Sequence, residues 1–414
     1  MIVDLPSTST TAVSKRLVKL RNESGAMTLG RVLTLIIVCD DETVDDAIEA
    51  ANAASHQHPC RIVVLVRANR RGSNRLDAQI RVGGDAGASE VVVMRLYGQL
   101  ADHGQRVALP LLLADSPVVV WWPHDAPRDV AGSPIGQLAD RRITDAAEAR
   151  NPQRELQRRA QTYAPGDTDL AWTRITIWRG LLAAALDQGP YEPVLEATVS
   201  GASDSPSTDL LAGWLADTLD CPVRRAKGPA GTGMTSVRLE RKSGPVDLVR
   251  PDGTVATLSQ PGQPIRRISL ARRSTAQCLA DELRRLDPDE IYSEALIGGM
   301  AEVRGRRAVP MDKAIADGEA PSLEESREER VTVARRARAL GSDKMVEEPP
   351  QSARDADTVH EAASRKLESK AAGEAGSGQV TAHTNADGAG DGDASDSDAA
   401  SPGDGESAAG SGTR

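Results

Sequence analysis

The sequence predicts an α/β protein with two Rossmann-like or α+β domains, followed by a disordered tail. Two nearly continuous apolar runs, at 31–40 and 60–68, flank an amphipathic helical segment. This is the pattern of a βαβ unit in a mainly parallel sheet that is buried on both faces. In the second domain, residues 235–270 alternate apolar and polar side chains between Gly/Pro turns. That alternation predicts an antiparallel meander.

The first domain is expected to alternate helices and strands. Residues 8–24 predict an amphipathic helix, and Thr43 begins an acidic form of the capping-box pattern before the helix between the two apolar runs. Residues 103–115 predict a short helix or crossover. Further strands are expected at 76–82, 90–97, 116–122 and 141–145.

The second half begins with helices. Asn151 and Pro152 suit a helix cap and first helical position, and 167–187 predicts one long helix with a broad apolar face, ended by the Gly189-Pro190 pair. A strand, a helix capped by Ser205 and a short strand then precede the meander. The last helices are expected to start at Ser274 and at Asp287-Pro288, the second ending at Gly298-Gly299.

The chain of 414 residues is long enough for two or three domains. Beyond residue 346, Ala, Gly, Ser, Asp and Glu dominate, so too little apolar surface exists to offset the ordering entropy. The expected segments are an N-terminal α/β domain (1–150), a helical connector with a Trp/Arg-rich helix (151–189), a C-terminal α+β domain (190–300), a charged, partly helical linker (301–345) and a disordered acidic tail (346–414).

Composition narrows the class of protein. The formal net charge of −10 argues against nucleic acid or an acidic membrane surface as the main partner. No apolar run is long enough to span a bilayer, and the first residues lack the features of a signal peptide. Four cysteines without a CxxC pair are typical of the reducing cytoplasm. Cys39 and Cys60 are expected at opposite edges of the sheet, roughly 15–20 Å apart, so a disulfide between them is not expected.

The sequence contains no recognisable catalytic or cofactor-binding motif. The first buried strand runs into CDDETVDD, whose carboxylates would repel a phosphate at a helix N-terminus. GPAGTGM, at 228–234, has glycines but no P-loop lysine and is interpreted as a turn. HQHPC, at 56–60, lacks the spacing of common zinc sites. The sequence therefore predicts no catalytic residue, no cofactor and no metal.

The adjacent Trp121 and Trp122 are the most conspicuous aromatic pair in a chain with five Trp and no Phe. On a strand they point to opposite faces, and they lie at the carboxyl edge, where α/β sheets bind ligands. Either both are buried under helices, or one is buried and the other meets a crevice or partner, since Trp is enriched at interfaces.

A second cluster is WTRITIW, at 172–178. Trp172 and Ile175 share one helix face, and Arg174 and Trp178 are four residues apart, so Arg174 is expected to stack on Trp178. The helix face that carries the arginines either contacts a partner, or its arginine side chains extend their charged ends into water.

Several stretches together resemble one family. MIVDLPSTSTTAVSKRLVKLR, MTLGRVLTLIIV, LPLLLADSPVVVWWP, RRITDA and DTDLAWTRITIWRGLLAAALDQ occur in order, and the match extends from residue 1 to about 300. They resemble the OpcA family, the actinobacterial glucose-6-phosphate dehydrogenase assembly proteins. The resemblance implies a non-catalytic protein that binds glucose-6-phosphate dehydrogenase, promotes its active oligomer and so supports the oxidative pentose phosphate pathway and its NADPH supply. It implies two α/β domains without a cofactor.

The resemblance and the Trp/Arg pattern together nominate partner-binding residues. Two other interpretations stay open: a Rossmann-like enzyme or small-molecule-binding protein acting on a nucleotide or sugar phosphate, and a redox relay. The oligomeric state of the chain itself is not predicted. The nominated positions are Asp115, Trp121, Trp122, Pro123, Arg141, Arg142, Trp172, Arg174, Trp178 and Arg179.

Overall fold

The computed structural model describes residues 1–24, 32–82 and 90–306. The chain divides into two compact units, 1–321 and 322–414, and every described residue belongs to the first. The predicted tail, and the predicted linker beyond residue 306, lie outside the described residues. The domain boundaries predicted at 150, 189 and 300 are not tested by this division and stay predictions.

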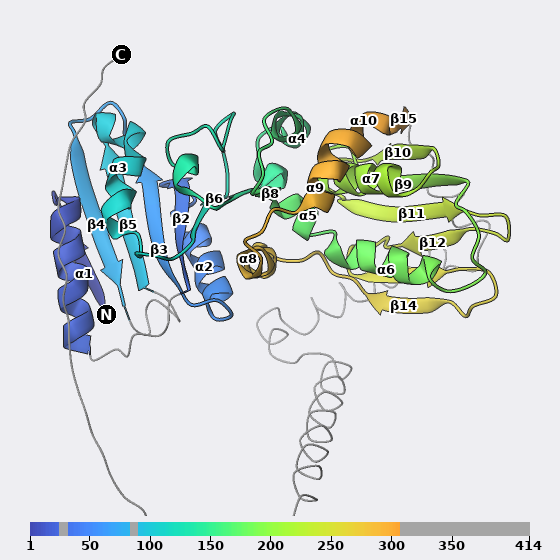
Figure 1. Cartoon of the computed structure of the whole chain (residues 1–414), viewed down its shortest axis with the longest axis horizontal. Helices are drawn as coiled ribbons and strands as arrows, with labels where there is room; N and C mark the ends of the chain where they lie inside the picture. Colours follow the sequence, from blue (N-terminus) through green and yellow to red (C-terminus); the bar gives the residue numbers. More distant parts are fainter. Residues whose placement is uncertain (25–31, 83–89, 307–414) are drawn as a thin grey trace, which may run out of the picture. The chain divides into compact units, whose positions relative to one another are not determined.

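The first sheet has eight strands in the order β1-β4-β5-β3-β2-β6-β7-β8 (Figure 1). Its six strands from β5 to β8 run parallel to one another, while β4 and β1 form an antiparallel edge. The mainly parallel N-terminal sheet is therefore confirmed. The strands are β1 (Ile2–Leu5), β2 (Leu33–Asp40), β3 (Cys60–Arg67), β4 (Arg75–Arg81), β5 (Glu90–Tyr97), β6 (Val118–Trp122), β7 (Arg141–Thr144) and β8 (Asp167–Asp169).

Helices bury both faces of this sheet. Helix α1 (Thr10–Ser24) packs with α3 (Gly104–Ala108) on one face, where Ile36 of β2 contributes to the core. On the other face, α2 (Val44–Ser55) and the distant α8 (Thr275–Arg284) cover residues such as Ile37. Successive residues of β2 thus enter opposite cores, which explains why the strand is apolar throughout.

The second sheet has seven strands in the order β14-β13-β12-β11-β9-β10-β15. Four strands from β11 to β14 form the predicted antiparallel meander, while β9, α7 and β10 form a βαβ unit with parallel strands. Helix α6 (Thr176–Leu186) packs against the meander in one apolar core (Figure 1). The elements are β9 (Glu196–Ala202), α7 (Pro206–Thr218), β10 (Val223–Gly228), β11 (Met234–Glu240), β12 (Val246–Val249), β13 (Val255–Ser259), β14 (Arg266–Ser269) and β15 (Arg304–Arg306).

Residues 167–187 do not form the predicted single helix. They form strand β8, the short helix α5 (Leu170–Thr173) and helix α6 (Thr176–Leu186). Asp167, Thr168 and Asp169 are extended because they pair with β7, and the Asp169 carboxylate caps α5 by accepting from the Ala171 N–H at 2.9 Å. Edge pairing and a cap interrupt a segment whose composition alone favours continuous helix.

Helix boundaries test the capping predictions. Asn151 accepts from the Arg154 N–H at the start of α4 (Pro152–Gln161), and Ser205 and Ser274 cap α7 and α8 as predicted. Thr43 makes no capping bond to α2, because its hydroxyl donates to the Asp40 carbonyl instead.

The last helical segment also differs from the prediction. Asp289, not Asp287-Pro288, caps α9 (Glu290–Glu294). The chain stays helical through Gly298 and Gly299, as a π-turn and then α10 (Met300–Glu302). Gly299 lies against the Gly213 backbone of α7, so its missing side chain permits close helix packing rather than ending the helix. Within the described residues, no helix combines the length and apolar character needed to cross a membrane.

Candidate functional site

Both tryptophans of β6 belong to the core. Trp121 is 1% exposed and lies with α2 and α8, whereas Trp122 is 2% exposed and lies in the core beneath α1. They point to opposite faces as predicted, but helices cover both. Neither indole presents a surface to a partner in this structure.

The arginines of β7 are buried in ion pairs. Arg141 donates to Glu282 of α8 at 2.5 and 3.1 Å and to the Asp287 carbonyl at 2.7 Å. Arg142 pairs with the Asp167 carboxylate and donates to the Ala139 carbonyl at 2.9 Å. These guanidinium groups therefore hold neighbouring elements together.

The Trp/Arg segment is likewise directed inward. The predicted stacking of Arg174 on Trp178 is wrong: Arg174 forms a two-pronged ion pair with Asp145, at 2.6 and 2.7 Å. Instead, Arg179 lies 3.7 Å above the ring of Trp172, whose indole N–H donates to Asp289 at 2.8 Å. Arg174 lies at the break between α5 and α6, from which it reaches Asp145, directly after β7.

Eight of the ten nominated residues are buried. Asp115 is exposed, in a left-handed turn with φ of 55°, and Arg179 is half-buried. The chain's own elements thus cover most of the nominated side chains, and their part in binding a partner stays a prediction.

Asp169 is a buried carboxyl group that the sequence reasoning missed. Burial, and secondly the nearby Asp145 carboxylate, raise its pKa to about 6. It accepts hydrogen bonds from the Thr144 hydroxyl at 2.6 Å and from the backbone N–H groups of Ala146 and Ala171. It is fully buried, so the shifted pKa marks a structural junction rather than an accessible acid or base.

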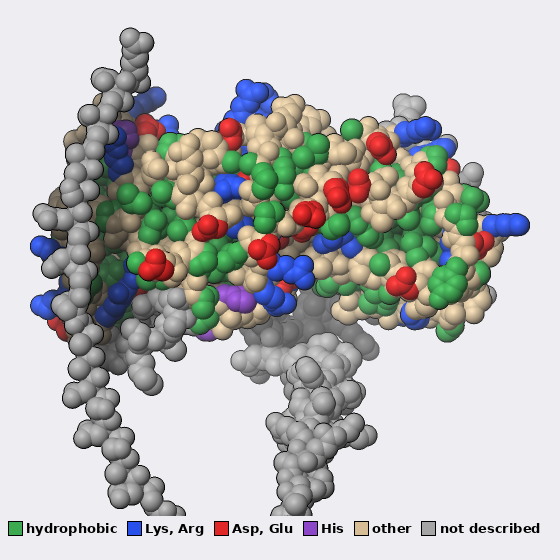
Figure 2. Space-filling view, viewed as in Figure 1, with side chains coloured by type: hydrophobic (Ala, Val, Ile, Leu, Met, Phe, Trp, Pro, Cys, Tyr) green, Lys and Arg blue, Asp and Glu red, His purple; other side chains and the backbone are tan. Residues whose placement is uncertain are grey.

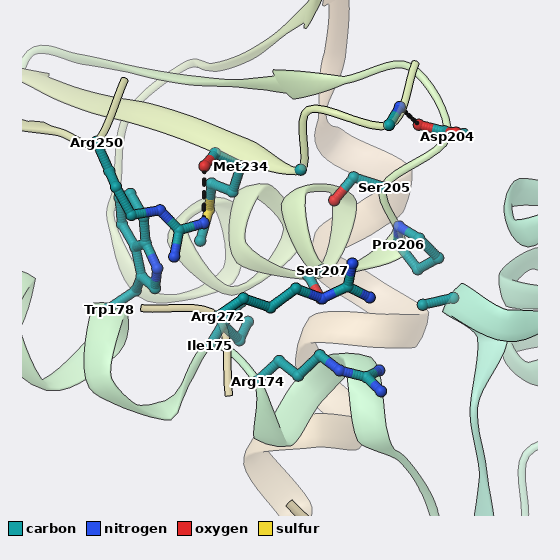
Figure 3. Close-up of a pocket in the computed structure, with 13 residues that line it drawn as sticks. Arg174, Ile175, Trp178, Asp204, Ser205, Pro206, Ser207, Met234, Arg250 and Arg272 are labelled. Carbon is teal, nitrogen blue, oxygen red and sulfur yellow. Dashed lines mark hydrogen bonds between the residues drawn. The ribbon is translucent and has the colours of Figure 1, made fainter. Parts of the chain in front are cut away.

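A small pocket lies beside this junction, between α6, the start of α7 and the turn at 229–233. Its volume is about 120 Å³. Figure 3 shows Trp178 and Arg250 at one side, Arg272 and Arg174 below, and Ser205 and Ser207 of the α7 start opposite. The turn belongs to GPAGTGM, at 228–234, for which the sequence predicts a turn. Only the fold brings these arginines to it, from positions far apart in the chain.

Reactive thiols and metal clusters do not mark another site in the part of the chain that the structure describes. None of the four cysteines forms a disulfide with another. Burial, followed by the Asp40 carboxylate, raises the pKa of Cys39 to about 12, and burial raises that of Cys278 to about 11. Residues 1–24, 32–82 and 90–306 contain no group of three His, Cys, Asp or Glu side chains arranged to hold a metal ion.

Fold and site together define a class: a two-sheet α/β protein with buried Arg–carboxylate junctions and an arginine-lined pocket. Two family models match the chain in order. The glucose-6-phosphate dehydrogenase subunit N-terminal domain matches residues 51–161, and the corresponding C-terminal domain matches 165–296. Together they cover more than half of the chain, which therefore belongs to the OpcA family of glucose-6-phosphate dehydrogenase assembly proteins.

Similar solved structures include an oxidoreductase from Sinorhizobium meliloti, at 12% identity and a TM-score of 0.31, covering 64% of this chain and 85% of that one. Another is glucose-6-phosphate 1-dehydrogenase from Mycobacterium avium, at 10% identity and a TM-score of 0.31, covering 66% of this chain and 94% of that one. A search of curated proteins gives no match.

Proposed function

We propose that this chain is a non-catalytic subunit that binds glucose-6-phosphate dehydrogenase, promotes its active oligomer and raises its activity. The observation that carries the proposal is the ordered match to both domains of a family described as a subunit of that enzyme. A partner that binds the active oligomer more tightly than the inactive form shifts the population toward it. A tenfold shift needs only about 1.4 kcal/mol of differential affinity.

The outer face of α6 is our candidate contact surface. Trp178 and Leu182 fix the inner face of this helix in the core. On the outer face, Ile177 is 43% exposed and Ala184 is exposed. Gly180 lies between them, with open space where a side chain would project. These residues lie three and four positions apart, so they form one apolar strip.

This strip adjoins the nominated Trp/Arg segment. Figure 2 shows hydrophobic side chains on the visible face in small groups among charged ones. Small residues such as Gly180 and Ala184 allow a partner backbone to approach closely, and apolar residues free of charge are typical of interface centres. The buried tryptophans then contribute by holding α6 in place.

The first test titrates the dehydrogenase with the purified full chain while its rate and oligomer size are followed. We expect a saturable rise in rate with co-elution of the two proteins. No complex and no change in rate would contradict the proposed function.

A matched pair of variants tests the contact surface. Ile177→Glu places a carboxylate on the outer face of α6 and should weaken binding about tenfold or more. Val18→Glu, at a residue of α1 that is 50% exposed, makes the same chemical change elsewhere and should leave binding unchanged. Equal affinity for both folded variants would exclude α6 as the contact while leaving the subunit role in place.

The proposal also places the protein in the reducing cytoplasm. Four cysteines without a disulfide, three of them buried, support this location.

A further inference from the structure

Arg250 is a buried cation that forms no ion pair with any described residue. It is 6% exposed, directly follows β12 and lines the pocket between α6 and α7. Its two terminal nitrogens donate to the carbonyls of Leu270 at 2.8 Å and Met234 at 3.0 Å, and its Nε has no hydrogen-bond partner. Carbonyls satisfy some guanidinium donors but do not neutralise the charge, and an uncompensated buried charge is costly.

The charge of Arg250 is only partly offset by its surroundings: its guanidinium carbon lies 5.0 Å from the centroid of the Trp178 ring, and the Asp252 carboxylate acts on it without forming an ion pair. Arg174 is already paired with Asp145, and the exposed Arg272 lies 3.7 Å from Glu148. Asp204, the carboxylate of the lining, accepts from the Gly231 N–H at 3.1 Å, on the opposite side of the pocket from Arg250 (Figure 3). Arg250 and Asp204 thus lie on opposite sides of the pocket, and the Arg250 guanidinium remains without an ion pair at one end.

The start of α7 adds backbone donors to this charge. The helix has thirteen residues, and its N-terminus carries partial positive charge. Ser205 caps the Thr208 N–H, whereas the Ser207 N–H has no partner within the described chain. Gly231 and Gly233 of the facing turn have φ of 80° and 68°, which glycine adopts without strain and which lets the backbone approach a ligand closely.

Size and geometry restrict the ligand. A volume of about 120 Å³ holds about four waters at roughly 30 Å³ each, far less than a drug-sized site of about 300 Å³ or more. A compact anion fits, as does the anionic end of a longer molecule. The donors come from Arg250, Arg272 and the α7 start, so they converge from several sides. That arrangement suits a tetrahedral group with three acceptor oxygens better than a planar carboxylate.

We propose that this pocket binds the phosphate group of a small phosphorylated metabolite, with Arg250 at its base and Arg272 at its mouth. Trp178, Ile175 and Met234 form the apolar wall beside the bound group. This inference goes beyond the proposed function and does not depend on the dehydrogenase. The same chemistry accommodates free phosphate, so the experiment separates the two sources.

The experiment is a calorimetric titration of the full chain alone. The probes are inorganic phosphate, a hexose 6-phosphate and the same hexose without phosphate. We expect inorganic phosphate and the hexose 6-phosphate to bind, and the hexose without phosphate not to bind. Tighter binding of the hexose phosphate identifies a phosphate monoester as the ligand, and equal binding shows that phosphate alone suffices.

Three variants locate the binding. Arg250→Gln should weaken phosphate binding about ten- to a hundredfold. Because Arg250 also bonds two carbonyls, that variant risks misfolding, so Arg272→Gln, at a side chain 61% exposed, provides a second test and should weaken binding about fivefold. Arg267→Gln, at an exposed arginine of β14, is the matched control and should bind as the parent does.

Three results would overturn the proposal that the pocket binds phosphate. The first is that neither inorganic phosphate nor the hexose 6-phosphate binds at about 10 mM. The second is that the bare hexose binds as tightly as the hexose 6-phosphate, and the third is that folded Arg272→Gln and Arg250→Gln proteins bind phosphate as the parent does. None of them bears on the subunit role, because the dehydrogenase is absent from the titration.

Discussion

The centre of the first sheet and its β7–β8 end are equally buried but chemically opposite. All residues of β2 from Leu33 to Cys39 are buried, and all but Thr34 are apolar. Every residue of β7 and β8 is also buried, yet together they comprise two arginines, two aspartates, two threonines and one isoleucine. The first region is stabilised by removing apolar surface from water, and the second requires a specific partner for each charge.

The comparison shows how a protein can bury charge at a junction. Arg141 and Arg142 of β7 pair with Glu282 of α8 and Asp167 of β8. The Asp169 carboxyl of β8 is held instead by hydrogen bonds from the Thr144 hydroxyl and from backbone N–H groups. A pair stabilises its surroundings only while both members are present, because removal of one leaves the other buried and alone. The two regions should therefore respond very differently to substitution.

The largest effect is expected at the charged end. Arg174→Met leaves the Asp145 carboxylate, whose side chain is 1% exposed, without its two guanidinium bonds. We expect a loss of about 3–5 kcal/mol in the free energy of unfolding, measured by denaturant titration.

Ile36→Val in the apolar centre is the control and should cost about 1 kcal/mol. A similar small loss in both variants would show that the Arg174–Asp145 pair contributes no more than ordinary packing. The comparison between the regions would then fail.

The next effect is a dependence on pH at Asp169. Its pKa is raised from 3.8 to about 6 in the folded chain, so the folded state binds this proton more tightly than the unfolded state does. The resulting stabilisation is fully present below pH 3.8 and is lost as pH rises through 6. As pH rises from 3.8 to above 6, the free energy of unfolding of the parent should fall by about 3 kcal/mol relative to that of Asp169→Asn.

Denaturant titrations of parent and Asp169→Asn at several pH values measure this difference. Asn keeps an acceptor oxygen for the Ala171 N–H but cannot ionise, which makes it a matched replacement. A stability difference that stays constant from pH 4 to 7 would contradict the raised pKa.

The smallest effect is expected in thiol reactivity. The comparison is between the three buried cysteines and the half-buried Cys221. Cys39, Cys60 and Cys278 are buried, and burial raises the pKa of Cys39 and Cys278, so little of the reactive thiolate forms. At pH 8, a thiol reagent should modify only the half-buried Cys221 in the native chain and all four thiols after unfolding.

Cys221→Ser should then abolish the native reaction. Rapid modification of Cys39 or Cys278 in the folded chain would reopen the redox relay that the sequence analysis left as an alternative.

Prediction succeeded where one physical signal was dominant. The apolar runs of β2 and β3, the alternation of β11 to β14 and the Ser205 cap of α7 were each visible in the sequence, and the structure confirms them. Strand β8 was missed because Asp-Thr-Asp carries no apolar signal, and the break before α6 was missed because it depends on the pairing of Asp169 and Arg174 with β7 and Asp145.

The sequence by itself determined the α/β class, most element positions and the family, because hydrophobic periodicity and motif order are local properties of the chain. Only the tertiary structure decided which tryptophans and arginines are buried, because burial depends on which distant element covers a residue. The same holds for the pocket: Arg250, Arg272 and the α7 start converge only after two sheets and their connections have folded.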